Sequence, residues 1–399
     1  MIAHVANWVL PITSPPIREG AVVVENGRIV LVGPAQEVLK GFSGRVCDHG
    51  HGAILPGVVN CHAHLEFSAL AGKVTPQKRW EDWLEATLAE SARLSPAEID
   101  TGISQGIQAL EQSGAALVAD VTNTGASWPH LEQAALQYHL FYECLGFDLL
   151  EQKDLTEWFP FFSQPRVAAA AHVSAAAHAP YSVSAPLFRA IREWNAARGR
   201  PQAVHLGESR AEVEFLARGN GFFEGLLRRR GRWVADFSPP RLSPGAYLER
   251  LGFLGRSTLA VHGVWLEAGD LEALRRSATW MVLCPRANRY TGAGTPPVAA
   301  LIEAGILLAL GTDSLAGNRD LNLFGEMLWL YRNFPAYRGD LWLRLGTING
   351  ALALGRDEDL GSLKAGKAAA LGFIPLMGGA DFWDELYTAG ARGGFCWLG

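Results

Sequence analysis

The feature that most constrains this 399-residue chain is an eightfold alternation of short apolar runs with longer amphipathic stretches. The runs are AILPGVVNCHAH, AALVADVTN, YHLFYECLGF, VAAAAHVSAAAH, QAVHLGES, TLAVHGVW, TWMVLCP and ILLALGTDS. The stretches between them, such as SAPLFRAIREWNAARGR, have helical spacing and begin at Ser or Pro. Strands that alternate with helices indicate parallel βα units. Eight units over about 300 residues predict an α/β fold, a distorted (β/α)8 TIM barrel.

Both ends of the chain follow a different pattern. AVVVENGRIVLVG contains two β runs around Asn26-Gly27, and Asn-Gly is typical of tight hairpins. Near the C-terminus, GSLKAGKAAALGFIP also has the pattern of turns and strands. We therefore predict a small β-sandwich formed by residues 1–55 together with residues 356–399, and we assign residues 56–355 to the barrel.

Composition excludes several classes of partner. The net charge is −5, and the only basic block is Arg228-Arg229-Arg230, which is typical of a solvated helix face, so nucleic acid is not expected. The five cysteines include no CxxC pair, which favours a reducing compartment. The N-terminus lacks the basic start of a signal peptide, and no apolar run has the length of a membrane span. We expect a cytoplasmic protein with no membrane partner.

Polar side chains gather where the predicted strands end, which is where barrels carry their chemistry. Five of the eleven histidines fall at the ends of four of the runs. The residues at strand ends are His62, His64, His178, His205, Glu208, His262 and Asp313.

His62 and His64 are two residues apart, so on a strand both would face the barrel interior. The pair alone does not separate a metal site from two buried core histidines. His205 would supply a third nitrogen and Asp313 a carboxylate, and such a mixed nitrogen and oxygen set suits zinc or iron. The four residues together predict a divalent metal site.

Two further residues are candidates for acid and base catalysis. Glu208 follows His205 at the mouth of the barrel, where a carboxyl beside a metal can shuttle protons. The alternative is an acid stabilised by a helix N-terminus. His262 would orient the attacking water or share its proton, and the alternative is a buried core histidine.

Six segments resemble the signature segments of the amidohydrolase superfamily, in the same order. They are PGVVNCHAHLEFS, HAPYSVS, HLGES, VHGVWL, CPRANRYTG and GTDSLAGNRDLNLFGEM. The resemblance covers nearly the whole chain and is strongest to the aminohydrolase branch, which includes deaminases of methylthioadenosine, S-adenosylhomocysteine and aminodeoxyfutalosine, and triazine chlorohydrolases. VVVENGRIVLVG and LGSLKAGKAAALGFI resemble the flanking β-sandwich of that family. The chain departs from it at GKAAAL, where an aspartate is common, which affects edge packing rather than chemistry.

The resemblance implies a role for each residue of the set. It implies one divalent metal bound by His62, His64, His205 and Asp313. Glu208 would be the proton shuttle and His262 would activate water. His178 would contact the substrate, and Trp83 and Glu90 match the region that packs the sugar in adenosine-type deaminases. An ordinary core aromatic is the alternative for Trp83.

The resemblance also bears on the number of metal ions. Dinuclear relatives bridge two ions with a modified lysine at the end of the fourth strand. The fourth run here, from Val167 to Ser184, contains no lysine. We therefore expect a mononuclear site, with zinc as the first choice and iron or nickel as alternatives.

The activity implied is a deaminase that replaces the exocyclic amino group of an adenine-bearing nucleoside by oxygen and releases ammonia. Glu208 would protonate the ring nitrogen, while Asp313 and His262 would take the proton from water. A guanine deaminase, a triazine-type hydrolase, a cyclic amide hydrolase and a non-catalytic scaffold stay open as alternatives. The sequence does not fix the oligomeric state, although homodimers are common among such barrels.

Arginines just beyond the strand ends bear on the substrate. An anionic substrate tail would pair with a guanidinium there, and the alternative for each is an ordinary surface arginine. The arginines are Arg210, Arg286, Arg289 and Arg319, of which we choose Arg286. The long segment after Glu208 would cover the pocket.

Overall fold

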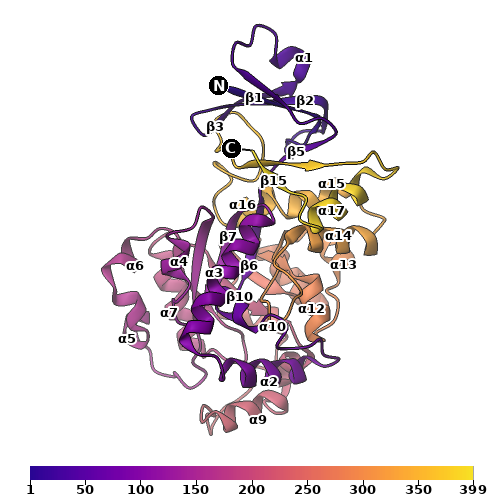
Figure 1. The fold of residues 1–399 in the computed structure, drawn as a ribbon. Helices are drawn as coiled ribbons and strands as arrows, with labels where there is room; N and C mark the ends of the chain where they lie inside the picture. The colour runs from indigo at the N-terminus through magenta and orange to yellow at the C-terminus, as the bar shows by residue number, and fades with distance from the viewer. Residues whose placement is uncertain (399) are drawn as a thin grey trace.

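The computed structural model describes residues 1–398 and contains two sheets, which form the two lobes of Figure 1. The larger sheet has eight strands, and each neighbouring pair is parallel. Its strands are β6 (Val58–Ala63), β7 (Ala115–Thr122), β8 (Gln137–Cys144), β9 (Val173–Ala177), β10 (Gln202–Leu206), β11 (Thr258–His262), β12 (Trp280–Leu283) and β13 (Leu307–Leu310). Each of the eight apolar runs contains one strand of this sheet, so the predicted barrel is confirmed.

The barrel closes between its first and last strands. An isolated parallel bridge joins Ala63 to Asp313, and the backbone N–H groups of Thr312 and Asp313 both donate to the carbonyl oxygen of His62 at 3.0 Å. A Cβ added at Gly311 would lie 2.7 Å from His62 Cβ, so glycine is required for this close approach. The closure brings the end of β13 against the end of β6, and with it Asp313 against His62.

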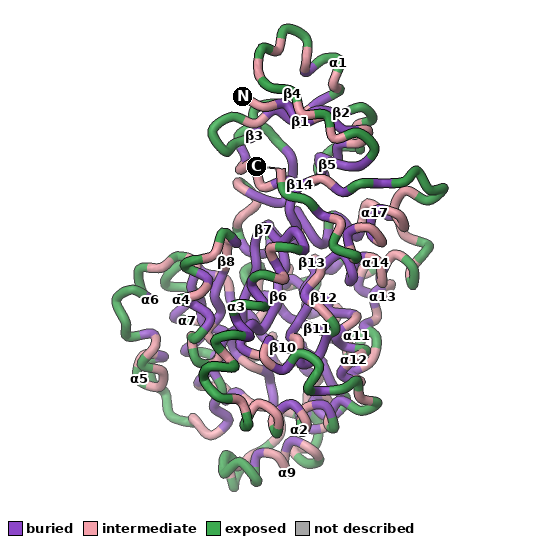
Figure 2. Tube along the Cα trace, viewed as in Figure 1, coloured by how far each residue is buried: buried purple, intermediate pink, exposed green. Residues whose placement is uncertain are grey.

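Helices and short turns surround the barrel strands, and the strands themselves are buried (Figure 2). Several begin where the sequence offers a cap: Ser95 and Glu98 form a capping box, and Ser184 accepts from the Leu187 N–H. The helical segments between β6 and β10 are η1 (Leu65–Leu70), α2 (Trp80–Ser91), α3 (Pro96–Gln112), α4 (Trp128–Leu131), α5 (Leu155–Trp158), η2 (Pro160–Ser163), α6 (Pro165–Ala169) and α7 (Ala185–Ala196). Those after β10 are α8 (Arg210–Arg218), α9 (Phe222–Arg229), α10 (Pro244–Arg250), α11 (Ala268–Ser277), α12 (Pro285–Thr291), α13 (Val298–Glu303), α14 (Leu323–Asn333), α15 (Gly339–Leu345) and α16 (Ile348–Ala353).

The second sheet, which we call the terminal sheet, combines strands from both ends of the chain. It consists of β1 (Ile2–Val9), β2 (Ile17–Glu25), β3 (Arg28–Pro34), β4 (Arg45–Asp48), β5 (Gly52–Pro56), β14 (Leu371–Pro375) and β15 (Cys396–Trp397), with the short helix α1 (Ala35–Val38) beside it. β2 and β3 form the predicted hairpin, in which Asn26 and Gly27 both have positive φ, at 50° and 72°. β14 pairs antiparallel with β5. The domain limits at residues 55 and 356 stay a prediction.

The C-terminal segment also contacts the barrel. Helix α17 (Phe382–Ala391) packs against α14. At the opposite end of the molecule from the terminal sheet lie α2 and α9 (Figure 1). Within residues 1–398, no helix combines the length and the apolar character needed to cross a bilayer.

Candidate metal centre and catalytic pocket

Four side chains converge at the carboxyl ends of the barrel strands. His62 and His64 come from the end of β6, His205 from β10 and Asp313 from the turn after β13. The Nε2 atoms of His62 and His64 are 3.2 Å apart, and those of His64 and His205 are 3.4 Å apart. Asp313 Oδ1 lies 3.7 Å from His62 Nε2 and 3.8 Å from His64 Nε2. All four residues are less than a tenth exposed.

The spacings among His62, His64 and Asp313, and the spacing between His64 and His205, fit donors to one tetrahedral ion. Four donors held 2.0–2.1 Å from one ion stand about 3.3–3.4 Å from one another, close to the distances observed. His205 Nδ1 lies 2.7 Å from the carbonyl oxygen of His178, which can only accept, so Nδ1 carries the proton and Nε2 faces the other donors unprotonated. The donor set therefore fits a divalent metal such as zinc or iron.

The protonation states of the three histidines are consistent with metal binding. Burial lowers the pKa of His62 and of His64 well below the ordinary value, with neighbouring imidazoles adding to the shift. Burial also lowers the pKa of His205 to about 3. Histidine binds a metal through its neutral form, and these three imidazoles are neutral near pH 7.

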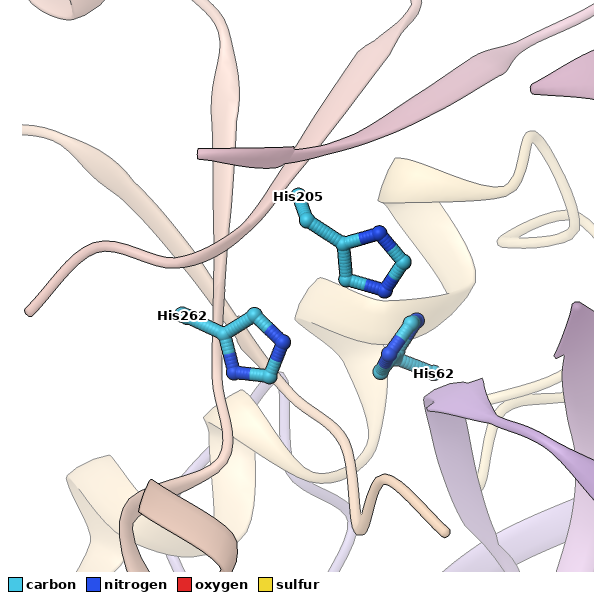
Figure 3. Close-up of side chains that lie close together, drawn as sticks. All are labelled: His62, His205 and His262. Atoms are coloured by element: carbon cyan, nitrogen blue, oxygen red, sulfur yellow. The ribbon is translucent and has the colours of Figure 1, made fainter. Parts of the chain in front are cut away.

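Glu208 and His262 lie beside the four donors. Figure 3 shows the His262 ring next to those of His62 and His205. His262 Nδ1 lies 2.8 Å from Asn288 Oδ1, so the proton is on Nδ1 and Nε2 is left to accept. That Nε2 is 3.8 Å from Glu208 Oε1. Burial raises the pKa of Glu208 to about 7 and lowers that of His262. Glu208 can therefore hold a proton near neutral pH, while the neighbouring His262 can accept one.

The backbone is strained at two of these positions. His262 has a φ of 79° and Asp313 a φ of 60°. Side chains other than glycine rarely adopt this left-handed region, and each such residue costs on the order of 1–3 kcal/mol. The surrounding fold holds both residues there, which aims the two side chains at the same point.

A cavity of about 290 Å³ opens beside this cluster. One end is polar and is formed by His64, His205, Glu208, His262 and Asp313, while aromatic and aliphatic side chains of η1 and α2 line much of the rest. A second cavity of about 480 Å³ adjoins it, since Leu84, Leu88, Leu145, His178 and Tyr181 line both.

The second cavity lies between α2 and α9 and is mainly apolar. Phe223 of α9 stacks on Tyr181 with ring centroids 3.6 Å apart. Arg230 and Arg232 lie at its wall, where Arg232 pairs with Asp148 at 2.9 Å. The long segment after Glu208 therefore forms one side of the extended pocket.

The residues assigned to the substrate divide into two groups. His178 lines both cavities, and its Nδ1 lies 2.6 Å from Ser182 Oγ. Trp83 lines the smaller cavity, and its indole N–H donates to the Ala316 carbonyl oxygen at 2.9 Å. The structure brings these two residues to the site, and their contact with substrate stays a prediction.

Glu90 and Arg286 do not join the pocket. Glu90, in the last turn of α2, pairs at 2.5 Å with Arg93, which follows the helix. Arg286 forms two hydrogen bonds with Asp320, at 3.0 and 2.7 Å, and lines a separate cavity that includes Arg289 and Arg319. Arg210 pairs with Glu214 within α8. None of these arginines lines the cavity beside His64, His205 and Asp313.

Sequence reasoning missed Glu143, which lines the smaller cavity. It lies near the end of β8, so its position at a strand end was the available signal. His139, Phe141 and Glu143 alternate along β8 and so share one face of the strand.

Comparison with known proteins gives consistent matches. The model of the amidohydrolase family matches residues 53–381. A 5-methylthioadenosine/S-adenosylhomocysteine deaminase from Pelotomaculum thermopropionicum is 28% identical over 370 residues, which cover 89% of this chain and 79% of that protein.

Solved structures with the same fold include two deaminases. Helicobacter pylori aminofutalosine deaminase in complex with methylthio-coformycin has a TM-score of 0.84 and 21% identity, covering 97% of this chain and 95% of that one. An adenosine deaminase from Xanthomonas campestris with bound zinc has a TM-score of 0.80 and 24% identity, covering 99% and 90%.

Proposed function

The chain belongs to the amidohydrolase family, and on that premise we propose that it is a mononuclear metal-dependent aminohydrolase that deaminates an adenine-bearing nucleoside. The observation that carries this proposal is the cluster of His62, His64 and Asp313, with His205 3.4 Å from His64, beside a buried acid and a buried base. The deaminases among its relatives and structural neighbours support the reaction class.

The metal site would be formed by His62, His64, His205 and Asp313. Zinc is the first choice, because it is bound in the Xanthomonas structure, and iron and nickel suit the same donors. When bound, the ion acts as a Lewis acid and lowers the pKa of a coordinated water to near neutral. β9 contains no lysine to bridge a second ion, which supports a mononuclear site.

Glu208 and His262 would move the protons. Glu208, whose pKa burial raises to about 7, would donate to the ring nitrogen next to the carbon under attack. That protonation makes the carbon more electrophilic. His262 would accept the proton of the attacking water through Nε2, with Asp313 beside it. A carbon–oxygen bond would form, and the proton held by His262 would pass to the exocyclic amino group. The carbon–nitrogen bond would then break to release ammonia, and the remaining hydroxyl proton would return to Glu208 as the carbonyl forms.

The adjoining cavity supports a nucleoside substituted at the 5′ position. The reacting ring must lie against the metal ligands, so the rest of the substrate points toward Leu145 and His178, where the larger cavity begins. Aminodeoxyfutalosine, S-adenosylhomocysteine and methylthioadenosine all carry such a substituent. A guanine or triazine ring alone would leave this apolar space unfilled.

Ammonia release from a substrate panel tests the proposal. The panel contains the three 5′-substituted nucleosides together with adenosine, guanine, a chlorotriazine and a cyclic amide. We expect the highest kcat/KM on a 5′-substituted adenosine, and we expect Asp313→Ala to abolish turnover. Preferred hydrolysis of the triazine or the amide would replace the proposal with that activity, and no turnover of any compound by metal-replete protein would favour a scaffold.

A further inference from the structure

Glu143 has a buried oxygen to which none of the described residues donates a hydrogen bond. The residue is 4% exposed and lies near the end of β8. Its Oε2 accepts a hydrogen bond from Asn123 Nδ2 at 2.7 Å, whereas Oε1 has no hydrogen-bond partner among the described residues. A buried carboxylate oxygen without a donor is costly. Such a group in a pocket calls for a donor from the ligand.

The nearest protein donor is already engaged. His205 Nδ1 lies 3.4 Å from Glu143 Oε1, but its proton is directed to the His178 carbonyl oxygen at 2.7 Å. In the neighbouring carboxylate of Glu66, by contrast, both oxygens accept hydrogen bonds. The Thr124 hydroxyl and the Ala126 N–H donate to Oε1, and the Asn123 N–H donates to Oε2. Glu143 therefore differs from Glu66. Asp120, near the end of β7, also has a buried oxygen without a partner among the described residues, but it does not line the smaller cavity.

The position of Glu143 identifies the part of the substrate that it would meet. It lines the smaller cavity next to Leu145 and His178, the residues that also line the larger one. Its Oε1 lies 3.4 Å from Nδ1 of His205, and the carboxylate is also close to His178, which lines both cavities. Besides Glu208 and Asp313, which the reaction uses, it is the only carboxylate among the described residues that line the smaller cavity.

The donors of an adenine nucleoside are few. The amino group is on the reacting carbon and must lie at the metal ligands. The other strong donors are the sugar hydroxyls, which come next along the molecule toward the junction.

We propose that Glu143 is a specificity-determining residue whose Oε1 accepts a hydrogen bond from a sugar hydroxyl of the substrate. This inference rests on the proposed function and deepens it by defining the substrate as a ribonucleoside. It assigns to Glu143 the sugar contact for which the sequence had indicated Glu90, a residue that the structure places in a surface ion pair with Arg93.

The test combines a substitution with matched substrates. kcat/KM is measured for 5′-methylthioadenosine and for its 2′-deoxy and 3′-deoxy counterparts, in wild type, Glu143→Gln and Glu90→Gln. A hydrogen bond to a charged group is worth roughly 10- to 100-fold, so wild type should lose that factor when the contacted hydroxyl is removed. Glu143→Gln should lose a similar factor on the ribonucleoside and little on that deoxynucleoside. Glu90→Gln, the matched control, should keep the wild-type ratio.

The competing role is positioning of His205 by Glu143. In that case Glu143→Gln would lower kcat/KM by the same factor on all three substrates, or would lower the metal content, and either result overturns the proposal. Equal rates of wild type on all three substrates would also overturn it. If Glu143→Gln does not fold, Glu143→Asp keeps the charge with a shorter reach, and its loss should again be confined to the substrate that carries the hydroxyl.

Failure of the proposed function is distinguishable from failure of this inference. Binding of the same nucleosides is measured in parallel by thermal shift. Absence of ammonia release from wild type would count against the deaminase, while a preference for ribonucleosides in binding that Glu143→Gln removes would still support the sugar contact. No such preference in either assay would overturn it.

Discussion

Two pairs of histidines in this molecule look alike locally and differ in their surroundings. In the terminal sheet, His4 Nδ1 lies 3.0 Å from His49 Nε2, and the rings stack. In the barrel, the Nε2 atoms of His62 and His64 are 3.2 Å apart. Burial is the main reason that the pKa of each of the four histidines is lowered.

The two pairs differ in the other side chains that lie close to them. No carboxylate of the described residues lies within ion-pair distance of His4 or His49, and His49 is partly exposed, so one hydrogen bond between the two rings satisfies the contact. The barrel pair also receives His205 from β10 and Asp313 from the turn after β13. Two adjacent imidazoles alone therefore do not indicate a metal site, whereas the addition of donors from distant strands does.

Of the substitutions considered, we expect the largest loss of activity when a histidine of the barrel pair is replaced, and almost none when a histidine of the terminal-sheet pair is replaced. We expect His64→Asn to lower kcat/KM by at least about a thousandfold, because the loss of a ligand removes several kcal/mol of stabilisation by the metal. His4→Asn should leave kcat/KM within about twofold of wild type, because its pair holds no catalytic group. Steady-state ammonia release checks both variants. A comparable loss in both would show that the two pairs are not functionally different.

Removing the acid while keeping the donors should have the next largest effect. Glu208→Gln cannot deliver a proton, so we expect kcat/KM to fall about 10²- to 10⁴-fold with the metal content unchanged. A variant that loses its metal would instead make Glu208 part of the donor set.

The pH dependence of Glu208 provides a further test of its role. Burial raises the pKa of this carboxyl to about 7, so the protonated form that donates is present below that pH and is lost above it. Wild-type kcat/KM should therefore fall on the alkaline side of about pH 7, about tenfold per pH unit at the limit. Glu208→Gln should lack this decline. A variant with the same decline would assign it to another group.

The smallest effect is expected from a substitution at Gly311, where β13 closes the barrel against β6. Gly311→Ala places a Cβ 2.7 Å from His62 Cβ, and overpacking of this kind costs about 1–3 kcal/mol. We expect a lower Tm and weaker metal retention. Gly269→Ala in α11 is the control, because a Cβ there has no neighbour within 4 Å. Equal Tm values for the two variants would show that the approach of β13 to β6 is not constrained at Gly311.

The barrel and the cluster of polar residues could be predicted because each depends on a repeating rule. Apolar runs that alternate with helices give parallel strands, and the carboxyl ends of such strands meet at one face. Residues as distant as His62 and Asp313 could therefore be placed together from their positions at strand ends. The structure places them with Oδ1 of Asp313 3.7 Å from Nε2 of His62.

The substrate side could not be predicted in the same way, because it depends on the direction of single side chains in loops and helices. Arg286 lies in the first turn of α12, three residues after the end of β12, yet its guanidinium bonds to Asp320. Glu90 is at the edge of the stripe of α2 that faces the pocket, and Arg93 holds its side chain. Glu143 was overlooked although the same rule applies to it, since its carboxylate also comes at a strand end.

The metal content of purified wild-type protein tests the central claim most directly. Elemental analysis by mass spectrometry after gentle purification should find about one divalent ion per chain, zinc first and iron or nickel otherwise. Less than about one tenth of an equivalent, or about two ions per chain, would contradict a mononuclear site built from His62, His64, His205 and Asp313.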